Sequence, residues 1–151
     1  MRRDTAVMET ETKSAAALSV YVIEDSPQIL ERLERMISAV PRIEVVGSAD
    51  NVTSAVADIE TLQPDALVVD IQLGSGSGLD VLWRVRQLQP DIHSIVLTNF
   101  SSAQHRKAAK DAGGDYFLDK TNEFSQVTPI LKQWRDAKAT PSSPPQISVK
   151  P

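Results

Sequence analysis

The sequence predicts an α/β fold in which a doubly wound, five-stranded parallel sheet has helices on both faces. Five short runs rich in branched residues, each of strand length, alternate with five segments of helical period. The chain has 151 residues, the size of one ordinary domain. Because strands and helices alternate throughout, we expect right-handed crossovers between parallel strands.

The expected strands are short and apolar, and three of them end directly in acidic or hydroxyl residues. In the common doubly wound arrangement the first strand lies in the middle of the sheet, so we expect the strand order 2-1-3-4-5. The strands are expected at residues 18–23, 42–48, 66–70, 93–98 and 115–119.

The first three helices have clear start or stop signals. Ser26 can cap the first helix, and Pro27 suits its first helical position. Pro64 closes the second helix and Pro90 closes the third. Their apolar faces are Ile29, Leu30, Leu33, Met36 and Ile37, then Val52, Ala55, Val56, Ile59 and Leu62, then Leu79, Leu82, Val85 and Leu88.

The last two helices are less regular. The fourth, at residues 102–112, is rich in alanine, and Gly113-Gly114 end it as a left-handed C-terminal cap would. The fifth contains Pro129, which has no amide to donate, so either Thr128 caps a later start or the helix kinks there. Its apolar face consists of Phe124, Val127, Leu131 and Trp134.

The folded domain is expected to span residues 18–137. Residues 1–17 are polar and are expected to form a disordered lead-in. Residues 138–151 hold four of the nine prolines and are expected to be a Pro/Ser-rich tail or linker. No apolar run approaches the ~20 residues that cross a bilayer, and the N-terminus lacks an apolar signal core. We therefore expect a cytoplasmic protein without membrane contacts.

Composition excludes several classes of site. The chain has no Cys, which rules out disulfides, Cys-ligated metal centres and a thiol nucleophile. Sixteen Lys plus Arg against twenty Asp plus Glu give a net charge of −4. This mildly acidic balance argues against direct nucleic-acid binding by the chain.

Acidic side chains collect at the strand ends, where ligands of open parallel sheets bind. Glu24 and Asp25 follow the first strand, and Asp70 ends the third, so neighbouring strands would bring three carboxylates together. Two such charges ~4 Å apart repel by roughly 4 kcal/mol at an effective dielectric near 20. A divalent cation, most naturally Mg²⁺, removes this cost. Thr98 adds a hydroxyl and Lys120 a mobile cation, which together suit a tetrahedral anion.

These residues resemble the motif of the receiver domain of bacterial two-component response regulators, particularly receivers that carry a helix-turn-helix output domain. The resemblance covers about residues 19–134 and implies a flavodoxin-like (βα)5 fold, with the receiver domain at 18–137. The matching residues are Glu24 and Asp25 in VIEDS, Asp70 in LVVDIQL, Thr98 in IVLTNF and Lys120 in YFLDKT, together with Gly78 and Gly113-Gly114.

The resemblance implies that Asp70 accepts a phosphoryl group from a histidine kinase or a histidine phosphotransfer protein. It implies that Asp25, Asp70 and the backbone carbonyl of Gln72 hold Mg²⁺, and that Glu24 acts through water.

The resemblance also implies a switch. Thr98 would hydrogen-bond one phosphoryl oxygen, and Lys120 would pair with another. Phe117 falls at the position of the family's switch aromatic, although a Phe on a short strand is also commonly a core residue. Movement of Thr98 would let this ring turn inward and bias the surface of the fourth helix, fifth strand and fifth helix toward partner binding.

Two stretches depart from the family pattern. Gly74 stands where many receivers have Pro, so we expect the loop at residues 74–77 to be unusually free. Asn99 and Phe100 are larger than the small residue often found after the hydroxyl. We expect them to restrict the access of water and small phosphodonors to an acyl phosphate.

The sequence therefore favours a stand-alone, non-enzymatic regulator with self-catalysed phosphoryl transfer, a downstream protein target and a possible homodimer. A receiver fragment of a DNA-binding regulator and a degenerate, phosphate-independent receiver stay open. A haloacid-dehalogenase-type phosphatase is disfavoured, because such enzymes place a second Asp where this chain has Gln72. A flavin or nucleotide carrier is disfavoured because EDSP, at residues 24–27, is no phosphate-binding loop.

Overall fold

The central sheet has five parallel strands in the order β2-β1-β3-β6-β7 in the computed structural model, which describes residues 17–139. The labels β4 and β5 belong to a separate hairpin, so the 2-1-3-4-5 order expected from the sequence is confirmed. The sheet strands are β1 (Leu18–Ile23), β2 (Ile43–Ala49), β3 (Ala66–Val69), β6 (His93–Thr98) and β7 (Tyr116–Asp119).

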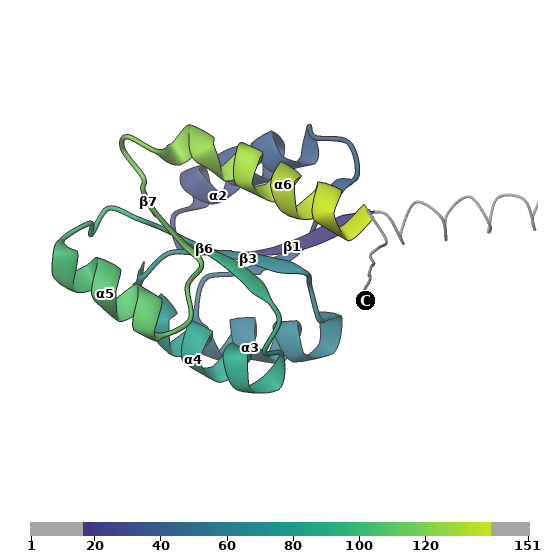
Figure 1. The fold of residues 1–151 in the computed structure, drawn as a ribbon. Helices are drawn as coiled ribbons and strands as arrows, with labels where there is room; N and C mark the ends of the chain where they lie inside the picture. The colour runs from purple at the N-terminus through teal and green to yellow at the C-terminus, as the bar shows by residue number, and fades with distance from the viewer. Residues whose placement is uncertain (1–16, 140–151) are drawn as a thin grey trace, which may run out of the picture.

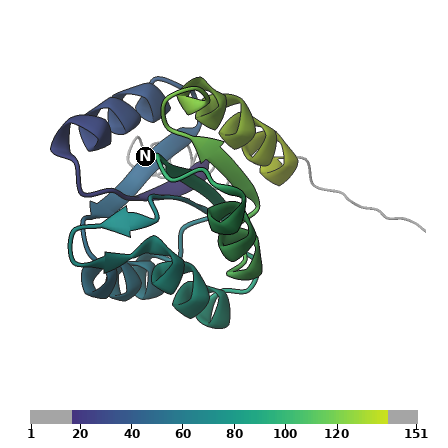
Figure 2. The same ribbon diagram turned by 90° about the vertical axis from the view of Figure 1, so that its left-hand side faces the viewer.

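Within residues 17–139, five α-helices cover the sheet, α2 and α6 on one face and α3, α4 and α5 on the other (Figure 1). Figure 2 looks at the edge at which the strands end and shows the same two helical layers. None of the described helices is long and apolar enough to cross a membrane. The helices are α2 (Pro27–Ser38), α3 (Val52–Leu62), α4 (Gly78–Leu88), α5 (Ala103–Asp111) and α6 (Val127–Ala139).

The helix starts and stops follow local sequence signals. The Ser26 side chain accepts the amide of Ile29 at 3.4 Å and caps α2, with Pro27 as the first helical residue. Gly113, just beyond α5, has a φ of 102°, the left-handed backbone that glycine adopts without strain. The stops predicted at Pro64 and Pro90 also agree with the ends of α3 and α4.

The interior strand β1 contributes to both cores because successive side chains of a strand point to opposite faces. Val20 and Val22 pack with α2 and α6, whereas Tyr21 and Ile23 pack with α3 and α4. All four side chains are at most 1% exposed. The strand end that carries the acidic pair is therefore held rigidly from both sides.

The start of α6 differs from both expectations. A short 3-10 turn, η1 (Phe124–Gln126), leads directly into α6 at Val127, so Thr128 does not cap a later start. Pro129 is the third residue of the helix and lies in the first turn. Amides of the first turn have no acceptor within the helix, so proline is tolerated there and no kink is needed.

The Gly-rich loop after β3 also differs from expectation. Instead of a free loop, β4 (Gln72–Leu73) and β5 (Gly76–Ser77) pair as a small antiparallel hairpin. Leu73 is buried and anchors this hairpin in the core that α3 and α4 cover.

The folded region reaches slightly beyond the expected boundaries. Ala17 is buried, and α6 continues past residue 137 to Ala139. The rest of the expected lead-in and tail, residues 1–16 and 140–151, lies outside the described residues.

The two ends of the domain meet at Asp65, just before β3. Its Oδ2 atom accepts the backbone amide of Ser19 at 2.8 Å and the ammonium of Lys138 at 2.7 Å. Burial opposes ionisation of Asp65, but these hydrogen bonds and the charge of Lys138 outweigh it and hold the pKa of the carboxyl below its ordinary value. This carboxylate thus joins the start of β1 to the end of α6.

We expect Asp65→Asn to lower the free energy of unfolding at pH 7 by about 1–3 kcal/mol, the contribution of hydrogen bonds to a charged group. Since the folded pKa is depressed, the stabilisation is complete above the unfolded Asp pKa of about 3.9 and is lost as the pH falls through the folded value. Urea denaturation at neutral and acidic pH, with the exposed Asp91→Asn as control, measures this. A stability difference that does not shrink in acid would contradict it.

Candidate functional site

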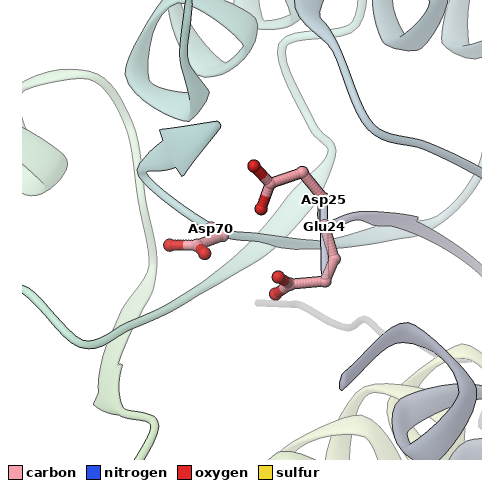
Figure 3. Close-up of side chains that lie close together, drawn as sticks. All are labelled: Glu24, Asp25 and Asp70. Carbon is pink, nitrogen blue, oxygen red and sulfur yellow. The ribbon is translucent and has the colours of Figure 1, made fainter. Parts of the chain in front are cut away.

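Three carboxylates meet at the edge where the strands end. Glu24 and Asp25 directly follow β1, Asp70 directly follows β3, and these two strands are paired neighbours. One oxygen of each carboxylate lies within 4.8 Å of the others, and Figure 3 shows all three side chains reaching to the same side. Glu24 and Asp70 are 2% and 6% exposed, whereas Asp25 is open to solvent. The structure thus brings together the acidic cluster that the sequence suggested.

Lys120, in the turn after β7, lies between the two buried carboxylates. Its Nζ atom is 2.7 Å from Asp70 Oδ2 and 2.8 Å from Glu24 Oε1, and the lysine side chain is 9% exposed. Burial pulls the pKa of Lys120 down, but hydrogen bonds and charges from Asp70 and Glu24 outweigh it, so the pKa lies above its ordinary value. Burial raises the pKa of Glu24 despite the ammonium beside it. The lysine offsets the repulsion between the buried acids.

Backbone amides from two loops orient the three carboxylates. The loop after β1 supplies one amide, and the segment that forms the β4–β5 hairpin supplies two. Hydrogen bonds of this kind restrict the side chains without adding charge. The pairs are Ser26 N to Glu24 Oε2 at 3.1 Å, Gln72 N to Asp70 Oδ1 at 3.2 Å and Gly74 N to Asp25 Oδ2 at 2.7 Å.

Thr98, the last residue of β6, completes the site from the third neighbouring strand. It is fully buried, and its Oγ1 atom accepts the amide of Phe100 at 3.2 Å. Its carbonyl accepts the amide of Lys120 at 2.9 Å, so hydroxyl and ammonium are linked through the backbone. Together with the carboxylates these residues line a cavity of about 290 Å³, in which Asn99 and Phe100 also take part.

Phe117 lies apart from this cavity. It is half-buried on β7, packs against the core that α3 and α4 cover, and has the guanidinium carbon of Arg106 4.7 Å from its ring centroid. The other residues expected in the site, Gln72 included, line the cavity. The core and switch interpretations of Phe117 are both compatible with this position.

Sequence reasoning missed the structural role of Gly78 and the orienting amides of Ser26 and Gly74. A Cβ atom at Gly78 would lie 2.0 Å from the carbonyl oxygen of Asp70, so only glycine lets α4 begin against the end of β3. The glycine at position 78 could have indicated this close approach of two backbone segments. Nothing in the sequence indicated the role of the two amides, because every residue except proline has a backbone amide.

The comparison with protein families agrees with this geometry. The model described as the response regulator receiver domain matches residues 20–132. The chain belongs to the response regulator receiver domain family. This match accounts for nearly all of the described residues, and no separate enzymatic domain is evident among them.

The curated relatives include two transcriptional regulators of one organism. The chain is 32% identical over 117 residues to the probable transcriptional regulatory protein TcrX of Mycobacterium tuberculosis, covering 76% of this chain and 48% of the relative. It is 27% identical over 115 residues to the DNA-binding transcriptional activator DevR/DosR of the same organism, covering 76% and 53%. The chain thus spans about half the length of these relatives.

Solved structures show the same fold. The response regulator domain of Thermotoga maritima CheB is 25% identical with a TM-score of 0.70, covering 83% of this chain and 99% of that one. The receiver domain of the putative regulator NarL from Mycobacterium tuberculosis is 22% identical with a TM-score of 0.73, covering 80% and 97%. The latter likeness concerns the fold alone.

We expect Gly78→Ala to lower the free energy of unfolding by about 1–3 kcal/mol through overpacking and to weaken Mg²⁺ binding, because the new methyl group displaces the end of β3 and with it Asp70. The control is Gly76→Ala, whose Cβ would lie 3.1 Å from a side-chain methyl of Val52. Urea denaturation and calorimetric Mg²⁺ titration measure both effects. Equal losses in the two variants would contradict the special role of Gly78.

Proposed function

We propose that this chain is a signalling domain in which Asp70 accepts a phosphoryl group from a histidine kinase or a histidine phosphotransfer protein. The observation that carries the proposal is the position of Asp70, a buried carboxylate held 2.7 Å from the Lys120 ammonium at the edge where ligands of such sheets bind. The family supports it, since receiver domains accept phosphate from histidine kinases.

In the proposed transfer an oxygen of Asp70 attacks the phosphorus atom of a phosphohistidine. The new O–P bond forms as the donor's N–P bond breaks, and the imidazole leaves with the bonding pair and takes up a proton. Asp25, Asp70 and the Gln72 carbonyl would hold Mg²⁺, with Glu24 acting through water. Bound there, the ion supplies neutralisation of the phosphoryl oxygens, and the crowded oxygens of the acidic cluster fit a hard divalent cation.

Lys120 and Thr98 would then receive the phosphoryl oxygens. The Lys120 ammonium exchanges its contact with Asp70 Oδ2 for a phosphoryl oxygen. Thr98 turns its hydroxyl to another oxygen, which releases the amide of Phe100. We propose that this rearrangement, together with an inward turn of Phe117, alters the α5–β7–α6 surface. The close packing of Phe117 against α5 through Arg106 supports such a connection.

The partners we propose are the phosphodonor protein and a downstream protein target in the cytoplasm, with homodimerisation as a possible mode of action. In this proposal the domain acts as a single-domain regulator without direct nucleic-acid contacts. A second candidate is the receiver of a DNA-binding regulator. It is favoured by the relatives named as transcriptional regulators, of whose length the chain spans about half. The presence of every motif residue speaks against a phosphate-independent receiver.

We expect the wild-type protein to gain the mass of one phosphoryl group on incubation with Mg²⁺ and a small donor such as acetyl phosphate, and Asp70→Asn to gain none. Intact-protein mass spectrometry measures the gain. The exposed Asp91→Asn, at the opposite edge of the sheet, is the matched control and should behave as wild type. Absence of the gain in the wild type with both small donors and phosphorylated histidine proteins, or its persistence in Asp70→Asn, would refute the proposal.

We expect Asn99→Ala to lose its phosphoryl group severalfold faster than the wild type. The Asn99 side chain lines the mouth of the acceptor cavity, so its removal admits water more easily to the acyl phosphate. Phosphorylated protein freed of donor and followed by mass spectrometry gives the decay rates. Equal rates of phosphoryl loss in the wild type and the variant would contradict this expectation.

A further inference from the structure

The ring of Phe100 stands at the mouth of the acceptor cavity. Phe100 lines this cavity and also a second hollow of about 290 Å³ between the β4–β5 hairpin and the start of α5. Its side chain is 41% exposed, which is unusual for a Phe and leaves it little core packing of its own. The contacts that hold the Phe100 ring in place therefore determine how open the cavity is.

His105, in the first turn of α5, supports the Phe100 ring. The two ring centroids are 5.5 Å apart with the planes tilted by 34°, within the range of favourable aromatic pairs. Like Phe100, His105 lines the second hollow, so the ring pair forms one wall of it.

Ser102 fixes the orientation of the imidazole. Its Oγ atom accepts the backbone amide of His105 at 3.2 Å and caps α5. The same Oγ atom lies 2.7 Å from Nδ1 of the imidazole. This contact and the bond from the backbone amide together restrict rotation of the imidazole. The helix cap thus aims the imidazole at Phe100.

Phe100 has a second anchor inside the site. Its amide donates to Thr98 Oγ1, the hydroxyl proposed to turn toward a phosphoryl oxygen. After that turn the amide has lost this acceptor, and the contact with His105 becomes the main restraint on the ring. The ring pair therefore matters most while an acyl phosphate is present.

We propose that His105 is a positioning residue that holds the Phe100 ring at the mouth of the acceptor cavity and thereby restricts the entry of water and small phosphodonors to Asp70. The inference rests on the proposed phosphoacceptor function and adds to it a specificity for the kind of phosphodonor. A protein donor, whose surface can displace the exposed ring as it docks, is favoured over a freely diffusing acyl phosphate.

The test compares His105→Ala with His105→Phe, which retains a ring beside Phe100, and with Gln104→Ala, an exposed neighbour, as control. Rates of phosphorylation by acetyl phosphate and by the smaller phosphoramidate, and of dephosphorylation, are followed by intact mass. We expect His105→Ala to raise the acetyl phosphate and decay rates about 2- to 10-fold, the factor that an aromatic pair contributes to an equilibrium. The ratio of the phosphorylation rate with phosphoramidate to the rate with acetyl phosphate should fall. Simple loosening of α5 would not change this ratio.

His105→Phe should stay within a factor of about two of the wild type, since the ring contact is kept. Unchanged rates and donor preference in His105→Ala, or equal acceleration in Gln104→Ala, would overturn the inference.

A second readout separates this inference from the proposed function. Labelling of Asp70 by a water-soluble carbodiimide and an amine, located by peptide mass, reports access to the cavity without phosphoryl chemistry. We expect faster labelling in His105→Ala than in the wild type and Gln104→Ala. If no protein is phosphorylated but labelling is faster in His105→Ala, the proposed function fails and the positioning role stands. If labelling is equal as well, both fail.

Discussion

The ion contacts of Lys120 with Asp70 and Glu24 are the constraint on which the rest of the site depends. Two carboxylates buried in one cavity repel each other, and removing one partner of a buried ion pair costs about 3–5 kcal/mol. The lysine reaches both acids at 2.7 and 2.8 Å. In the sheet, β6 lies between β7 and β3, so the Lys120 side chain must reach past the end of β6 to make this contact.

The same cavity is connected to the surface by short backbone links. The Thr98 carbonyl holds the amide of Lys120, and the Thr98 hydroxyl holds the amide of Phe100, two residues farther along the chain toward α5. In the proposed mechanism, a change at Asp70 would therefore be transmitted to the start of α5 as well as through Phe117. At the opposite edge of the sheet, Asp65 ties β1 to α6 through hydrogen bonds that involve none of these residues.

The fold and the charged side chains of the site could be predicted from the sequence, because their signals are local or repeat with a period. Glu24, Asp25 and Asp70 were expected together because they stand at the ends of two strands expected to be neighbours. The hairpin at residues 72–77 could not be predicted, since its stability comes from burial of Leu73 and from an amide contact with a residue distant in the sequence. The same holds for the His105 imidazole, whose orientation depends on a cap hydroxyl and whose ring partner is set by a loop.

The most direct test of the central claim is a crystal structure of the protein with Mg²⁺ and beryllofluoride, a mimic of the phosphoryl group. We expect beryllium bound to an Asp70 oxygen, the metal on Asp25, Asp70 and the Gln72 carbonyl, and Lys120 moved from the Asp70 carboxylate to a fluorine. Beryllofluoride absent from Asp70, or Lys120 still paired with both carboxylates while the mimic is bound elsewhere, would contradict it.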